Sequence, residues 1–208
     1  SGAIYIVKYN AWDFAFLGVT TLTGESCSLG PPNTGNQQLG WAMTAADVDG
    51  DGVLELLATL RGSGSSGDIA ILRLSEDGAV QHTQLLPARG MLLQLLQPWQ
   101  ANSLLGSSIA FSPATASEPA AVLLGAPQLD LAAAASSQVL EASSSGAVLR
   151  LQLAAAVAPV QQDGSDMVLA HMQLASTAAS PPGAASSPFG GAVAVLDQAE
   201  DFVVVAVR

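Results

Sequence analysis

Four short, strand-like phrases recur along this chain in one fixed order. The first is an apolar residue followed by glycine, the second is an apolar run, the third is an apolar run that begins with glycine, and the fourth reads His-x-Gln-Leu. The first phrase occurs at 39–43, 105–110 and 189–194, and the second at 54–58, 121–127 and 201–206. The third occurs at 2–6, 67–72 and 146–151, and the fourth at 82–85 and 171–174. Such a repeat constrains the fold strongly, because each unit has to bury its apolar faces against its neighbours.

A repeated unit of four strands is typical of a β-propeller, whose blades are four-stranded sheets arranged around a central channel. We therefore expect an all-β fold made of antiparallel blades. The expected units are the outer strands of a first blade at 1–30, complete blades at 31–90 and 91–175, and the first strands of a further blade at 176–208. Residues 91–97 are expected to form a short helical turn between blades.

An acidic loop at 47–55 joins the first and second phrases of the second unit. It holds four of the chain's 17 acidic residues, at relative positions 1, 3, 5 and 9. Carboxylates packed this closely repel one another, and calcium, which takes six to eight oxygen ligands, relieves that repulsion. Gly50 and Gly52 allow the positive φ angles of a tight loop. The expected calcium ligands are the side chains of Asp47, Asp49, Asp51 and Glu55 and the carbonyl of Val53.

Two other interpretations of the acidic loop are weaker. A solvated acidic turn is the plainer alternative, because Asp-Gly is also ordinary turn chemistry. An EF-hand requires flanking helices and an acid at position 12, but position 12 is Ala58, and the flanks at 39–46 and 53–61 are short and apolar like strands. The corresponding segment of the next unit, 111–118, lacks the acidic run. The sequence therefore predicts one calcium ion, held between two antiparallel strands.

The phrases Leu105-Gly106 and Phe189-Gly190, the Gly-Ala-Pro ending at 125–127 and the acidic loop together resemble the FG-GAP repeat. This repeat is known from integrin α-subunit heads and from the C-terminal propeller of glycosylphosphatidylinositol-specific phospholipase D. The resemblance covers nearly the whole chain and implies a seven-bladed propeller, of which about three blades lie here. The remaining blades are then expected outside this chain. Glu55 departs from the aspartate usual in the family, although its longer side chain still reaches a metal ion.

The resemblance implies a non-catalytic, calcium-braced module for protein binding or scaffolding, in cell adhesion or another extracellular or cell-surface assembly. Two alternatives stay open at this point. The chain is also compatible with the accessory propeller of a phospholipase D-like hydrolase, whose catalytic centre lies in a separate domain. It is compatible as well with a structural component of a ciliary or surface complex.

Composition narrows the class of partner. The formal net charge is −11 and the pI is about 4.2, which argues against nucleic acid and anionic lipid as partners. No apolar run reaches the 18 or so residues of a membrane span, and no signal peptide is visible. The chain opens and closes within strand-like phrases at 3–7 and 202–207, so we expect it to be a fragment of a longer protein.

The remaining candidate residues have simpler explanations. The G-x-G-x-x-G match at 62–67 is followed by a strand-like phrase and not by a helix, so it predicts a hairpin loop and not a dinucleotide site. His82 and His171 occupy matching phrases in different units, which favours packing or hydrogen bonding over a shared metal. The single cysteine, Cys27, and Trp41 are both expected to be packing residues.

Overall fold

Among the residues that the computed structural model describes, the regular structure consists of twelve β-strands and almost no helix. The described residues are 2–29, 38–61, 67–88, 104–115, 119–129, 146–155, 169–179, 192–198 and 201–207. The strands are β1 Ala3–Tyr9, β2 Phe16–Thr23, β3 Gln38–Ala46, β4 Glu55–Arg61, β5 Asp68–Leu74, β6 Val80–Leu86, β7 Ser108–Ser112, β8 Ala121–Ala126, β9 Ala147–Ala155, β10 Leu169–Ala179, β11 Ala192–Gln198 and β12 Asp201–Val207. The prediction of an all-β fold is confirmed.

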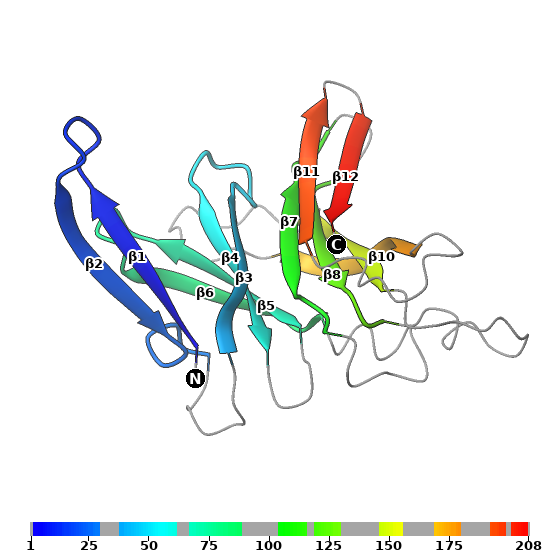
Figure 1. Ribbon diagram of the computed structural model, residues 1–208, viewed down its shortest axis with the longest axis horizontal. Coiled ribbons are helices and arrows are strands. Elements are labelled where there is room, and N and C mark those ends of the chain that lie inside the picture. The colour runs from blue at the N-terminus through cyan, green and yellow to red at the C-terminus, as the bar shows by residue number, and fades with distance from the viewer. Residues whose placement is uncertain are drawn as a thin grey trace, which may run out of the picture.

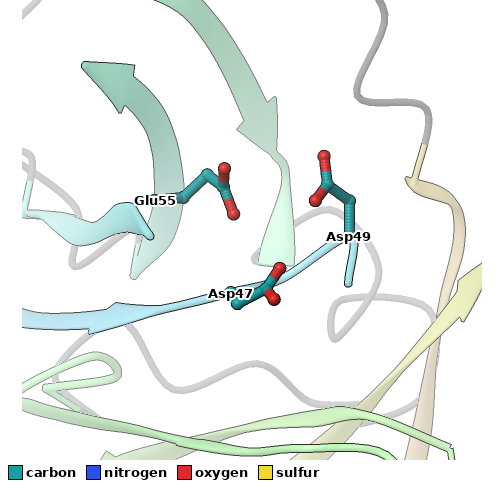
Figure 2. Close-up of side chains that lie close together, drawn as sticks. All are labelled: Asp47, Asp49 and Glu55. Carbon is teal, nitrogen blue, oxygen red and sulfur yellow. The ribbon is translucent and has the colours of Figure 1, made fainter. Parts of the chain in front are cut away.

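The strands form four separate antiparallel sheets that follow one another along the chain (Figure 1). Two have four strands, in the orders β3-β4-β5-β6 and β7-β8-β9-β10, and two have two strands, β1-β2 and β11-β12. Each sheet is a simple meander, because every strand pairs with its neighbour in sequence. The acidic loop joins β3 to β4, and Figure 2 draws the side chains of its Asp47, Asp49 and Glu55. It therefore connects two antiparallel strands, as predicted.

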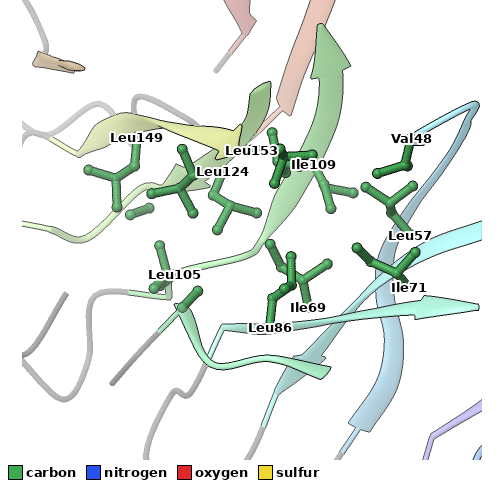
Figure 3. Close-up of a cluster of buried hydrophobic side chains, with 14 of the residues drawn as sticks. Val48, Leu57, Ile69, Ile71, Leu86, Leu105, Ile109, Leu124, Leu149 and Leu153 are labelled. Carbon is green, nitrogen blue, oxygen red and sulfur yellow. The ribbon is translucent and has the colours of Figure 1, made fainter. Parts of the chain in front are cut away.

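The sheet β3–β6 is buried on both faces, and its residues contribute to two separate apolar cores. Alternate residues of a strand point to opposite faces, so neighbours in sequence belong to different cores. On β4, Leu57 faces the sheet β7–β10, while Ala58 faces the sheet β1–β2. On β5, Ile71 likewise faces the sheet β7–β10, and Leu72 faces the sheet β1–β2. Figure 3 shows the larger core between the two four-stranded sheets. Its labelled members are Val48, Leu57, Ile69, Ile71, Leu86, Leu105, Ile109, Leu124, Leu149 and Leu153.

The sheet β7–β10 also has apolar contacts on both faces. Val122 and Leu124 of β8 belong to the core shared with β3–β6, whereas Leu123 between them packs on the opposite face, where Val193 of β11 contacts its cluster. The first strands of successive sheets lie next to one another, since β3 contacts β7 and β7 contacts β11. The sheets therefore pack face to face in chain order.

One junction between consecutive sheets occurs twice, and it joins two of the repeated phrases. Gly67, just before β5, lies so close to Leu105 that an added Cβ would come 2.5 Å from that leucine's side chain. Gly2, just before β1, approaches Leu39 in the same way, with backbone atoms 2.3 Å from an added Cβ. Real Cβ atoms do not approach this closely, so both positions require glycine. The sequence repeat thus corresponds to a repeated contact in three dimensions.

Several smaller predictions have outcomes in the fold. Cys27 is fully buried, as expected, and burial raises the pKa of its thiol. Trp41, expected to be a core or inter-blade packing residue, is 49% exposed and stacks under the Arg61 guanidinium, 4.3 Å from the ring centroid. The pairing of β3 with β4 is irregular between Leu39 and Met43, the stretch that contains Trp41. The expected helical turn at 91–97 lies outside the described residues.

Within the described ranges, no helix has the length and apolar character that a membrane span requires.

Candidate metal site

The acidic loop is built between the paired ends of β3 and β4, where Ala46 lies opposite Glu55. Gly50 and Gly52 have φ angles of 81° and 87°, which confirms the expectation of positive φ at both glycines. These angles are unfavourable for residues with a Cβ. They turn the chain tightly enough to bring carboxylates that are separated in sequence onto one side of the loop.

Short-range hydrogen bonds hold the aspartates of the loop in place. Both carboxylate oxygens of Asp47 accept backbone N–H groups, from Gly50 at 2.7 Å and from Gly52 at 2.9 Å. Asp49 Oδ1 accepts the N–H of Asp51 at 3.1 Å, and Asp51 Oδ1 accepts the N–H of the next ligand candidate, Val53, at 2.8 Å. The bonds that Asp49 and Asp51 accept from the N–H two residues on are the Asx turns that aspartate favours.

Glu55 differs from the aspartates because it is fully buried, with 0% of its surface exposed. Its Oε2 accepts the N–H of Val48 at 2.9 Å, while Oε1 has no hydrogen-bond partner among the described residues. Burial is the main reason that the pKa of Glu55 lies above its ordinary value, and the nearby charge of Asp49 adds to the effect. An incompletely satisfied buried carboxylate is costly, and this oxygen could still accept a hydrogen bond or bind a cation.

The structure brings three of the predicted ligands together. Asp47, Asp49 and Glu55 each offer an oxygen, and these oxygens lie within 4.8 Å of one another. Figure 2 shows the three side chains around a common space. Asp51 is outside this group, and Val53 lies on the loop with 42% of its surface exposed. The group could hold a metal ion through oxygen donors, the kind of ligand that calcium prefers.

Arg73 of β5 is a neighbour of this site that the sequence interpretation missed. Its Nη1 lies 3.4 Å from Asp49 Oδ2 and 3.9 Å from Glu55 Oε1, and its Nη2 donates a hydrogen bond to Asp51 Oδ2. The signal was present: Arg73 is one of only six basic residues in the chain, and it follows Ile71 by two positions on a strand of the same unit. It places positive charge directly beside the acidic loop.

The charges around the loop affect its carboxylates differently. Burial raises the pKa of Asp49, with further contributions from the charges of Asp51 and Asp47. The pKa of Asp51 is lowered, first by the N–H of Val53 and then by Arg73. The hydrogen bond to Asp51 in turn raises the pKa of Arg73. Burial therefore dominates at Asp49, whereas hydrogen bonds from the backbone and from Arg73 favour the charged form of Asp51.

The two histidines lie on the fourth strands of their sheets, His82 on β6 and His171 on β10. His82 is not part of the metal-binding group found among the described side chains, which consists of Asp47, Asp49 and Glu55. The glycine-rich segment at 62–66 lies outside the described residues, and Gly67 leads directly into β5, as a hairpin loop requires.

A comparison with protein-family models gives no match for this chain, and a search of curated proteins gives none either. Nothing in these comparisons points to catalysis.

Proposed function

We propose that this chain is part of a β-propeller of the FG-GAP type, in which calcium braces the β3–β4 loop. The module would bind or organise other proteins at a cell surface or in an extracellular assembly. The observation that supports the proposal is the way in which the sheets follow one another. Consecutive meanders pack face to face, and their first strands β3, β7 and β11 adjoin one another. This is the relationship expected of the inner strands of propeller blades.

The repeated junction between sheets supports the same proposal. Gly67 packs on Leu105 as Gly2 packs on Leu39. In addition, the hydroxyl of Thr59 on β4 donates a hydrogen bond to the carbonyl of Gly106 at 2.8 Å, which links the two four-stranded sheets. A ring of blades requires a contact of this kind to recur between neighbouring units.

The outer face of the β1–β2 sheet is consistent with a further blade beside it. Ile4 and Leu22 are buried against the next sheet, but Tyr5, Val7 and Tyr9 on the other face are 65%, 45% and 58% exposed. Exposed apolar patches of this kind mark surfaces that another molecule or domain covers. In a complete propeller, a neighbouring blade would cover this face as β1–β2 covers the sheet β3–β6.

Calcium would be held by the carboxylates of Asp47, Asp49 and Glu55, with Asp51 and the carbonyl of Val53 as the further ligands that the sequence predicts. The buried, incompletely bonded Oε1 of Glu55 is the structural observation that fits a cation here. The ion would supply positive charge and oxygen coordination, and so offset the repulsion among the carboxylates. Its role would be to make the β3–β4 loop rigid, and no chemical step is assigned to it.

The test is a calcium titration by calorimetry with a parallel thermal melt, on the wild type and on Asp49→Ala. We expect the wild type to bind one ion. At a calcium concentration a hundredfold above Kd, the stabilisation would be about 2.7 kcal/mol, which raises Tm by about 5–10 °C for a chain of this size. Asp49→Ala should lose most of the affinity, because it removes a ligand oxygen.

Asp13→Ala is the matched control. Asp13 also accepts a backbone N–H two residues on, from Ala15 at 3.0 Å, but it lies in the exposed β1–β2 hairpin. The substitution therefore removes the same charge and the same kind of turn at a distance from the loop, and it should leave calcium binding unchanged. If Asp49→Ala binds calcium and melts like the wild type, the metal site is assigned to the wrong residues.

The propeller itself is tested by electron microscopy of the full-length protein. A disc of blades around a central channel, with the sheets of this chain as consecutive blades, would support the proposal. An open stack or a two-layer sandwich would contradict it.

A further inference from the structure

We infer that Arg73 competes with calcium for the acidic loop, so that the ion has to displace its guanidinium in order to bind. This inference rests on the proposed calcium site and extends it by naming the residue that sets its affinity. The observation behind it is that one guanidinium contacts three carboxylates of the loop at once: those of Asp49, Asp51 and Glu55.

The carboxylate oxygens that face Arg73 are those that accept no hydrogen bond from the backbone. Oδ1 of Asp49 accepts a backbone N–H of the loop, and its Oδ2 lies 3.4 Å from Nη1 of the guanidinium. Likewise, Oδ1 of Asp51 accepts a backbone N–H, and its Oδ2 accepts a hydrogen bond from Nη2. Oε2 of Glu55 accepts a backbone N–H, and its Oε1 lies 3.9 Å from Nη1. A metal ion that needs these oxygens would meet the guanidinium there.

The sheet register explains why Arg73 points at the loop. Leu56 of β4 lies opposite Leu72 of β5, so the next position on each strand brings Glu55 and Arg73 to the same end of the sheet. Leu57 and Ile71, two residues inward, share one core on a common face. Because side chains alternate along a strand, Glu55 and Arg73 extend that face beyond the apolar core, at the mouth of the loop.

Two cations cannot share these oxygens without cost. Calcium requires ligand oxygens at about 2.3–2.6 Å, and a guanidinium beside the same oxygens repels it. Binding therefore includes the loss of the Arg73 contacts. Arginine forms a planar fork suited to carboxylates, so its contacts are harder to give up than those of a lysine. The residue would keep the acidic loop folded at low calcium and reduce its affinity for the ion.

The experiment compares Arg73→Gln with the wild type by calorimetric titration with calcium alone, and by thermal melts in chelator and in saturating calcium. We expect Arg73→Gln to bind calcium about tenfold more tightly, which corresponds to about 1.4 kcal/mol. In chelator the variant should melt below the wild type, because the acidic loop loses its counter-ion. In saturating calcium the two melting temperatures should converge, since the arginine contacts are then absent from both proteins.

Two further variants separate competition from a general charge effect. Arg61→Gln makes the same change in net charge at the other end of β4, where the side chain stacks on Trp41, and its calcium affinity should stay within about twofold of the wild type, because distant surface charges interact weakly. Arg73→Lys retains a positive charge without the fork and should fall between the wild type and Arg73→Gln.

Each outcome has a definite meaning. If the wild type binds calcium and Arg73→Gln binds equally or more weakly, Arg73 supports the ligands and the inference is overturned, while the calcium site stands. If Arg73→Gln binds calcium and the wild type does not, the competition is supported in its strongest form. If neither protein binds calcium, the metal site fails and the inference fails with it.

Discussion

Leu57→Ala and Leu72→Ala test whether the sheet β3–β6 is truly packed on both faces. Both leucines are 0% exposed, but Leu57 belongs to the core toward β7–β10 and Leu72 to the core toward β1–β2. Truncation of a buried leucine removes its apolar contacts and leaves a cavity, at a cost of about 2.7–5.0 kcal/mol. We expect each variant to lose about 3 kcal/mol of unfolding free energy. Leu54→Ala, at a site that is 62% exposed, should lose less than about 0.5 kcal/mol.

The assay is urea unfolding followed by circular dichroism, with a thermal melt of each variant. A loss of 3 kcal/mol corresponds to a fall in Tm of about 6–12 °C for a chain of this size. Unchanged m values would show that the variants alter stability and not the extent of unfolding. The decisive result is Leu72→Ala. If it is as mild as Leu54→Ala while Leu57→Ala is severe, only one face of the sheet is buried, and the arrangement is a two-layer sandwich.

Three further predictions concern the loop and the junction between sheets. Burial raises the folded-state pKa of Glu55. In chelator, the wild type should therefore lose stability relative to Glu55→Gln as pH rises from the ordinary glutamate pKa through the raised one. A difference between their melting temperatures that does not change with pH would contradict this. Thr59→Val should cost about 1–3 kcal/mol in urea unfolding, because the carbonyl of Gly106 loses its donor, whereas Thr59→Ser should cost less. Gly106→Ala should destabilise more than Gly50→Ala: both glycines have φ near 80°, but an added Cβ meets atoms at 3.2 Å at Gly106 and open space at Gly50, and equal melting temperatures would refute the close packing.

Features that depend on neighbouring residues could be predicted from the sequence. The strands at 3–7 and 202–207 lie within β1 and β12, because alternating or continuous apolar runs are a local signal. The positive φ angles of Gly50 and Gly52 followed from the spacing of the acidic loop. The exposure of Trp41 could not be predicted in this way, because the pairing of β3 with β4 is irregular between Leu39 and Met43, and simple alternation does not assign residues to faces at such a point.

The candidate site shows the same division. Turn chemistry and glycine conformation act over a few residues, so the sequence was enough to predict four carboxylates on one tight connection between two strands. The convergence of Asp47, Asp49 and Glu55, the burial of Glu55 and the contact of Arg73 with the loop depend instead on how the strands pack in three dimensions. These facts depend on the register between strands, where a shift of one residue turns every side chain to the opposite face. Sequence spacing alone does not specify that register.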